Sequence, residues 1–139
     1  MKRLIYIMLP FVFLSCEESL TEKNLKMYPN GNIQVQQLIN KKGEVKKEIQ
    51  FFENGKRRIE GCFDELGRRD GVWNSYYEDG KLWSTSEYSE GQQHGWNRVN
   101  YSNGKVRFEG LWEKDKQSGP WFFYSEKGEL LKSEDYSKQ

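Results

Sequence analysis

The sequence of 139 residues has few of the side chains on which enzyme chemistry depends, with one histidine, His94, and two cysteines, Cys16 and Cys62. A structural zinc site needs about four clustered Cys, His or carboxylate ligands, so we expect no zinc and no other metal. A nucleophile activated by histidine would depend on His94, and nothing in the sequence singles out a partner for it. The same loop position holds Asp70 or Ser118 in other repeats, which indicates a loop side chain and not a general base.

The loops that bind phosphate or calcium are also missing. No Gly-rich loop is followed by the Lys-Ser/Thr pair of a Walker-type phosphate site, and no Asp-rich loop has EF-hand spacing. Glu60 and Glu109 hold equivalent repeat positions, as the paired carboxylates of a glycoside hydrolase could, but Thr85 and Ser133 fill that position elsewhere. A position of such mixed identity is more simply explained as one on the solvent-exposed face of a strand. We therefore predict a non-enzymatic protein with no catalytic residue and no cofactor.

Neither sign of charge dominates the chain. The sequence contains 22 Lys and Arg against 21 Asp and Glu, and the two kinds are interspersed. A nucleic-acid binder carries a basic patch or stripe. Lys41-Lys42 and Arg57-Arg58 are short exceptions that need no partner if they are solvated strand or turn residues. We expect no nucleic-acid partner.

No hydrophobic run is long enough to cross a bilayer, which takes about 20 apolar residues. The apolar stretch 4–14 has eleven residues and follows two basic ones. A basic start, a short apolar core and a small residue before the cut are typical of a secretory signal peptide, which we place at residues 1–15. The Ser15-Cys16 pair resembles a bacterial lipobox, which implies that Cys16 becomes the lipidated first residue, although Phe13 replaces the usual Leu. In the alternative, an ordinary signal peptide is removed and Cys16 is incidental.

Lipidation at Cys16 would hold the protein on a membrane in the cell envelope. Residues 16–27 would then form a polar tether, because they show no apolar period. Glu17-Glu18 resembles the acidic sorting signal of some surface lipoproteins, which favours the outer membrane or the cell surface, with a solvated linker as the alternative. Cys62 would have no cysteine to pair with, and we expect it to be a small strand side chain.

Glycine, by contrast, is frequent and regularly spaced. One series lies in turn dipeptides whose glycines are 24 or 25 residues apart: Asn30-Gly31, Asn54-Gly55, Asp79-Gly80, Asn103-Gly104 and Lys127-Gly128. A second series is a Gly-x-x-x-Gly pair at Gly67 and Gly71 and again at Gly91 and Gly95, with Asp115 and Gly119 in the third copy. The chain is therefore a tandem repeat of about 24 residues, which favours a surface over a catalytic pocket. Asn-Gly and Asp-Gly predict two-residue type I′ hairpin turns.

The residues between the turns alternate between apolar and polar, which is the period of a strand. Eight positions after each turn glycine stands a large apolar or aromatic residue: Ile39, Phe63, Tyr88, Trp112 or Tyr136. Six positions after it stand the small residues Gly61, Ser86 and Gly110, which we expect to make room for a ring from the next strand. The predicted fold is all-β, with tandem hairpin repeats forming a single elongated, twisted antiparallel meander sheet. Lys132 and Glu134 are expected to cap its last face with polar groups.

Two segments carry a recognisable motif. The segments Gly71-Val-Trp73-Asn-Ser-Tyr76-Tyr-Glu-Asp-Gly80-Lys-Leu82 and Gly119-Pro-Trp121-Phe-Phe-Tyr124-Ser-Glu-Lys-Gly128-Glu-Leu130 resemble the MORN-variant repeat. The resemblance covers residues 28–136, which we take as the repeat domain. In this region the chain is similar to the YwqK-family antitoxins. In the middle copy, Trp96 directly follows Gly95 and Asn97 holds the usual Trp place. We expect Trp96 to lie on the opposite face unless a bulge intervenes.

Tryptophan is the residue type most open to a functional interpretation. A tryptophan that is not part of the core is a candidate contact for a protein partner, and we consider Trp83, Trp73, Trp96 and Trp121. For each of them, a place in the core is the alternative. Trp83 is the strongest candidate, because alternation places it on the otherwise polar face of its strand.

These observations favour a membrane-anchored lipoprotein whose repeat sheet is a non-enzymatic protein-binding module in the cell envelope. The partner would be an unknown protein, either an envelope protein or a toxin. The family resemblance implies the alternative, an antitoxin or immunity protein that neutralises a toxin by direct binding.

Overall fold

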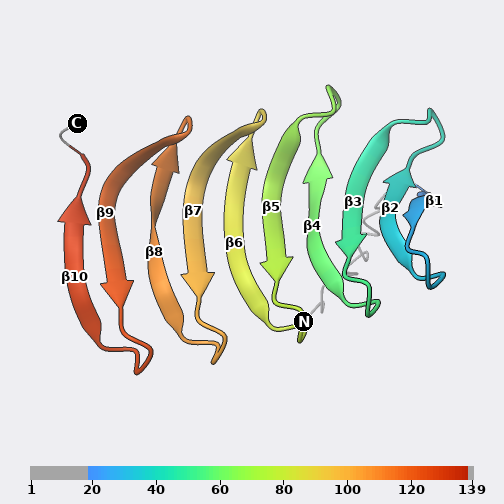
Figure 1. The fold of residues 1–139 in the computed structure, drawn as a ribbon. Helices are drawn as coiled ribbons and strands as arrows, with labels where there is room; N and C mark the ends of the chain where they lie inside the picture. The colour runs from blue at the N-terminus through green and yellow to red at the C-terminus, as the bar shows by residue number, and fades with distance from the viewer. Residues whose placement is uncertain (1–18, 138–139) are drawn as a thin grey trace, which may run out of the picture.

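The computed structural model describes residues 19–137, which form one open antiparallel sheet (Figure 1). Ten strands follow one another in chain order, and each pairs with its neighbour in the sequence. They are β1 (Thr21–Met27), β2 (Ile33–Ile39), β3 (Val45–Phe51), β4 (Arg57–Phe63), β5 (Arg69–Tyr76), β6 (Leu82–Ser89), β7 (Gln92–Asn100), β8 (Val106–Glu113), β9 (Lys116–Tyr124) and β10 (Leu130–Asp135). No helix occurs in this part of the chain. The predicted all-β meander is confirmed.

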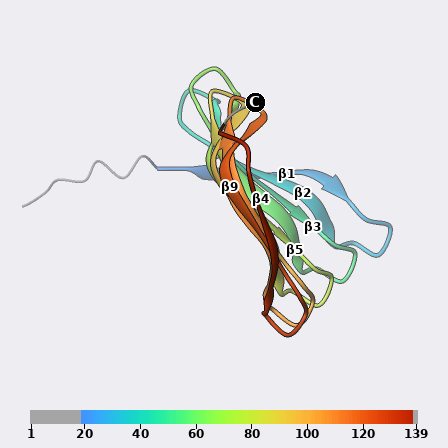
Figure 2. The same cartoon turned by 90° about the vertical axis from the view of Figure 1, so that its left-hand side faces the viewer.

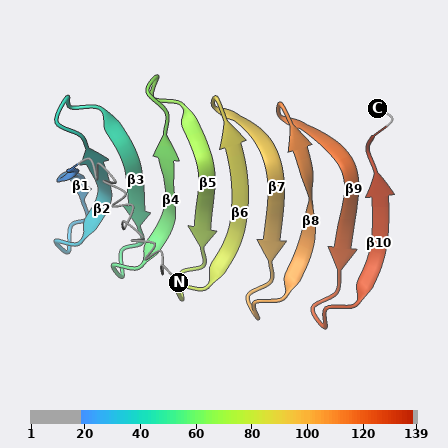
Figure 3. The ribbon, with the colours of Figure 1, turned by 180° about the vertical axis from the view of Figure 1, so that it is seen from behind.

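The sheet is a single twisted layer. Views of its two faces show no other element of the described residues lying over either one (Figures 1 and 3). Seen from the end, the layer is thin, and β1, β2 and β3 diverge from β9 (Figure 2). Such a layer buries little, and among the described residues the buried apolar side chains are Ile49, Val99, Trp73 and Trp121.

Strand pairing assigns side chains to two faces. The Trp73 face contains a row of directly paired residues that runs from Trp73 on β5 to Trp121 on β9 through Ser86, Asn97 and Gly110. The Glu60 face contains the neighbouring row, which is Glu60, Asn74, Thr85, Arg98 and Glu109. Because side chains alternate along a strand, these two rows define opposite faces.

The sheet begins earlier than the sequence predicted. Residues 21–27 were expected to belong to a tether, but they form β1, which pairs with β2 from Thr21 opposite Ile39 to Met27 opposite Ile33. Every side chain of β1 is exposed, so the strand has no apolar period to reveal it. The edge backbone of β2 supplies the pairing instead. The predicted signal peptide and Cys16 lie outside the described residues.

The lower edge of the sheet in Figure 1 contains five equivalent loops, 28–32, 52–56, 77–81, 101–105 and 125–129. In the first, Gly31 N–H donates to the Tyr28 carbonyl at 3.0 Å and Tyr28 N–H donates to the Asn32 carbonyl at 2.8 Å. Gly31 has a φ of 88°, whereas Asn30 is not among the residues with positive φ. This is a three-residue loop, a type I turn followed by a left-handed glycine. The prediction of type I′ turns at Asn-Gly is therefore wrong.

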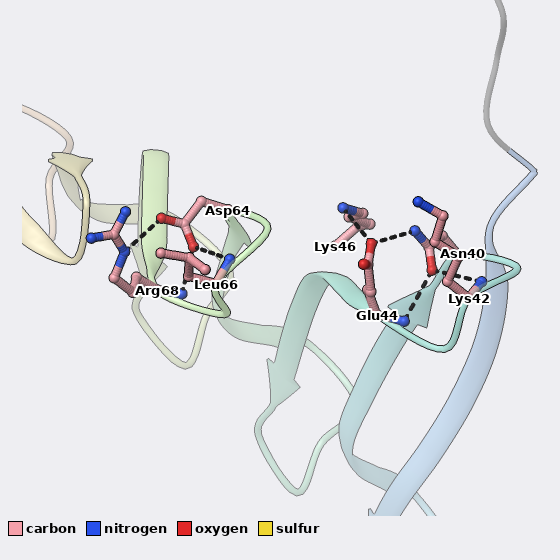
Figure 4. Close-up of polar contacts among 7 residues, drawn as sticks. All are labelled: Asn40, Lys42, Glu44, Lys46, Asp64, Leu66 and Arg68. Atoms are coloured by element: carbon pink, nitrogen blue, oxygen red, sulfur yellow. Dashed lines mark hydrogen bonds and ion pairs between the residues drawn. The ribbon is translucent and has the colours of Figure 1, made fainter.

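Two loops at the upper edge have the same three-residue form and show how a side chain supports it (Figure 4). The Asn40 side-chain oxygen accepts bonds from the backbone N–H groups of Lys42 and Glu44. In the next loop, Asp64 accepts from Leu66 and Arg68 in the same way. Hydrogen bonds from the backbone and side chain of Arg68 hold the pKa of Asp64 below its ordinary value.

The type I′ geometry occurs instead in the β6–β7 and β8–β9 loops of the upper edge. Glu90 and Gly91 both have positive φ, and so do Lys114 and Asp115. Asp115 replaces glycine there, and its carboxylate accepts a hydrogen bond from Gln93 N–H at 2.8 Å. Asp115 makes this bond while its backbone is in the left-handed conformation, which is unfavourable for most residues other than glycine.

Side chains of the lower-edge loops donate hydrogen bonds to backbone carbonyls of the next lower-edge loop, or of the strand residue just before it, 21 to 24 residues on. The donors are Tyr28, Asn30, Asn32, Asn54, Lys56, Tyr77, Lys81, Tyr101, Asn103 and Lys105. In the last loop the corresponding residues are Ser125, Lys127 and Glu129, and no such bond leaves that loop within residues 19–137. The ladder fixes the spacing of the repeats and ends at the last one.

Candidate functional site

Trp73 is a core residue. It is 3% exposed, and its indole Nε1 donates to the Cys62 carbonyl at 3.0 Å. Phe63 and Tyr88 meet its ring edge-on, at centroid distances of 5.2 and 6.3 Å. A Cβ at Gly61 would lie 2.1 Å from the ring, so only glycine leaves room there. The predicted role of the glycine is confirmed, and Trp73 is not available as a partner contact.

Trp121 repeats this arrangement four strands away. It is 2% exposed, and its Nε1 donates to the Leu111 carbonyl at 3.1 Å. A Cβ at Gly110 would lie 2.3 Å from its ring. Trp112 and Tyr136 meet the ring edge-on at centroid distances of 5.6 and 6.1 Å. Trp121 is therefore also core, and its candidacy as a contact was wrong for the same reason.

The middle repeat replaces this pair with polar residues. Asn97 occupies the Trp position, is 8% exposed, and donates from Nδ2 to Ser86 Oγ at 2.6 Å. Ser86 stands where Gly61 and Gly110 stand in the flanking repeats. A small residue that faces no tryptophan need not be glycine.

The tryptophan displaced by this exchange, Trp96, is 46% exposed on the Glu60 face, as predicted. It lines a hollow of about 470 Å³ together with Thr85, Arg98 and Asn100. In the flanking repeats a tyrosine stands at the position of Asn100, and it donates to a glutamate of the preceding strand. The hollow therefore lies where the middle repeat lacks both that ring and that carboxylate.

Glu60 was expected on a wet face but is 8% exposed. Lys47 Nζ lies 2.8 Å from its Oε2, Arg57 Nη1 lies 3.2 Å from its Oε1, and Tyr76 donates to Oε1 at 2.6 Å. Burial opposes the charge, but these three partners hold the pKa of Glu60 below its ordinary value. Burial, followed by the hydrogen bond to Glu60, raises the pKa of Tyr76. The network is structural, because its donors surround the carboxylate.

Trp83 is 44% exposed, but it does not lie on the face that alternation predicted. The pairing shifts between Ser75–Ser84 and Tyr76–Leu82, so Trp83 is the extra residue of a β-bulge. It lines a hollow together with Ile59 and Ser75, two residues of the Trp73 face. The bulge resets the alternation and turns Trp83 toward that face.

The Trp83 hollow is the candidate binding site. It measures about 620 Å³ and lies over β3 to β6, near the lower edge of the sheet. Phe52, Ile59 and Tyr77 supply its apolar wall, and the Tyr77 and Trp83 rings lie 6.5 Å apart between centroids. Arg58 and Arg69 also line it, with Glu78 on the same lining. An open apolar floor bordered by cations is suited to binding.

Sequence reasoning did not identify the arginines of this site. The pairing skips one residue near the start of each even-numbered strand: Gln34, Arg58, Trp83, Arg107 and Leu131. Arg107 therefore lies on the Trp73 face beside Tyr101, with its guanidinium 5.8 Å from the ring centroid, as Trp83 lies beside Tyr77. All five residues stand three positions after a turn glycine. They could have been assigned to the same face from the sequence only if a bulge had been expected at that position.

The other chemistry-bearing side chains are dispersed. His94 and Cys62 are exposed and lie on different strands, and within residues 19–137 no cluster of three His, Cys, Asp or Glu side chains could hold a metal ion. That same part of the chain contains no helix with the length and apolarity needed to traverse a bilayer.

Comparison with known proteins gives one family match. Residues 69–90 match the MORN repeat variant. The matched segment holds β5, the 77–81 loop and β6, and therefore both Trp73 and Trp83. No relative is found among the curated proteins. A crystal structure of the GtfA/B complex bound to UDP and GlcNAc is similar over 80% of this chain and 25% of that one, with 15% identity and a TM-score of 0.46.

Proposed function

We propose that this protein is a non-enzymatic binding module that docks a protein partner on the Trp83 hollow. The observation that carries the proposal is the contrast among the tryptophans of the sheet. Trp73 and Trp121 are buried in the core, whereas Trp83 has 44% of its surface exposed beside an apolar wall. Half-exposed tryptophans beside tyrosine and arginine are favoured contact residues at protein interfaces.

The module would act in the cell envelope, anchored through a lipid on Cys16. The leader that precedes Cys16 supports this part of the proposal, because its basic start, short apolar core and Ser15-Cys16 end fit a lipoprotein signal. We expect Cys16→Ala to abolish labelling by a palmitate analogue and to release the protein to the soluble fraction. Membrane retention without the label would argue against the lipid anchor.

An immunity or antitoxin role is the second candidate. The resemblance of the motif at Gly71–Leu82 to the MORN-variant repeats of such proteins favours it. An immunity lipoprotein in the envelope would use the same hollow to cover a toxin, so the two candidates differ in the partner and not in the site.

Partner capture from solubilised envelope membranes tests the site. Trp83→Ser should lose the partner recovered with the wild-type protein. Trp96→Ser is the matched control, because Trp96 is equally exposed but lies on the Glu60 face. Circular dichroism and a thermal melt establish that both variants are folded. Loss of the partner with Trp96→Ser and not with Trp83→Ser would move the site to the other face and refute the proposal.

A further inference from the structure

Three arginines on the Trp73 face have no acidic partner in the protein. Among residues 19–137, no carboxylate lies within the 4.0 Å ion-pairing distance of Arg58, Arg69 or Arg107. The arginines of the Glu60 face, Arg57 and Arg98, are both paired with glutamates. Unpaired guanidiniums are therefore confined to the face that presents Trp83.

We propose that an acidic, extended segment of a partner protein lies across the Trp83 hollow and the neighbouring Arg107 of β8, with carboxylates on Arg58 and Arg107 and an apolar side chain against Trp83. This inference rests on the proposed function and names the chemistry of its partner. Charge complementarity carries it, since guanidinium groups pair well with carboxylates at interfaces.

The three side chains are evenly spaced. Arg58, Trp83 and Arg107 occupy the same bulge position on β4, β6 and β8. Strands lie about 4.8 Å apart, so successive members are about 10 Å apart and the two arginines about 19 Å apart. An extended chain advances about 3.3 Å per residue, so the two carboxylates would be about six residues apart with the apolar residue midway.

The cations are also held in place. Arg58 Nη2 donates to the Gln50 side chain, which itself donates to Glu48 at 2.9 Å. The Arg69 guanidinium lies 4.1 Å from the Trp73 ring centroid and 5.4 Å from that of Tyr88. Arg107 lies over Tyr101. Stacking of this kind leaves guanidinium edges free to meet carboxylates and lowers the entropy lost on binding.

A nucleic acid or an anionic membrane would need more positive charge. The 22 basic and 21 acidic side chains of the sequence fall to 19 of each when Lys2, Arg3, Lys138, Glu17 and Glu18 are left out, so the described part is neutral. Binding of either polyanion scales with the number of cations engaged. Two arginines that line the aromatic hollow, with Arg107 beyond it on the same face, fit a short segment with a few acidic residues better.

The test is titration of the 15N-labelled protein with the acetylated and amidated peptide ESGLGSE, followed by NMR. The Trp83 indole and the amides of Arg58 and Arg107 should shift in a saturable way, while QSGLGSQ should shift them little. The double variant Arg58→Gln/Arg107→Gln should weaken binding about tenfold. The control Lys41→Gln/Lys42→Gln removes the same charge from the loop between β2 and β3 and should change nothing. Equal binding of both peptides, or equal affinity in both variants, would overturn the inference.

Two further arms separate this inference from the proposed function and from other polyanions. If the captured partner depends on Trp83 but not on Arg58 and Arg107, the docking site stands and its acidic specificity is refuted. If oligo-dT or vesicles containing phosphatidylglycerol bind through these arginines while ESGLGSE does not, an acidic protein segment is the wrong occupant.

Discussion

At the scale of single residues, the fold depends on pairs that fit only together. Gly61 faces Trp73 and Gly110 faces Trp121, while the middle repeat pairs Ser86 with Asn97. The sequence revealed the small residues and the tryptophans separately, and spacing alone was enough to infer that one makes room for the other. It did not reveal that Trp73 and Trp121 are core, because that depends on how closely the rings of adjacent strands surround them.

The pairing predicts non-additive substitutions. Gly61→Ser alone should destabilise the protein by about 1–3 kcal/mol or more, because its Cβ would clash with the Trp73 ring. Trp73→Asn alone should cost about 3–5 kcal/mol through lost packing. The double variant recreates the pair of the middle repeat, and denaturant unfolding should find it less destabilised than the sum by more than about 1 kcal/mol. A strictly additive result would show that the two positions do not act as a pair.

Glu60 predicts a pH dependence. Its pKa lies below the ordinary glutamate value of 4.5, so its ionised form stabilises the fold above that pH, and the contribution is lost as the pH falls through the lowered pKa. The difference in unfolding free energy between wild type and Glu60→Gln should therefore be larger at pH 7 than at about pH 3. Glu126→Gln, at an exposed loop position, should show no such trend. A Glu60→Gln deficit that persists unchanged into acid would exclude the charge as its source.

At the scale of elements, repeat spacing and alternation were enough to predict the hairpins. They were not enough to predict the geometry of the loops or the position of the bulges. Asn-Gly supports either a two-residue or a three-residue loop, and the hydrogen bonds to the next loop accompany the three-residue form. The bulge at Trp83 is invisible to a period-two count, so its face was predicted wrongly. The fully exposed β1 was missed because it has no apolar side to detect.

The β8–β9 loop predicts a stabilising substitution. Lys114 has a φ of 50°, a left-handed conformation that costs lysine more than it costs asparagine. Lys114→Asn should raise the free energy of unfolding by about 0.5–1 kcal/mol in denaturant melts. Asp115→Gly should gain less, because it also removes the bond to Gln93. Lys116→Asn, in the adjoining strand, is the control, and a gain there equal to that of Lys114→Asn would refute the turn explanation.

At the scale of the whole molecule, the sheet is a single layer with both faces open. Many of its aromatic rings pack against rings of neighbouring strands on the same face. The polar end predicted at Lys132 and Glu134 is present as an ion pair of 2.7 Å, and the hydrogen-bond ladder of the lower edge ends beside it. Each face has one exposed tryptophan beside a hollow, which is Trp83 on the Trp73 face and Trp96 on the Glu60 face.

Site-directed photo-crosslinking in envelope preparations distinguishes these two surfaces most directly. A benzoylphenylalanine placed at position 83 should capture a discrete protein partner, and the same group at position 96, equally exposed on the opposite face, should capture none. Crosslinks from position 96 alone, or identical crosslinks from both positions, would contradict the claim that the partner docks on the Trp83 hollow.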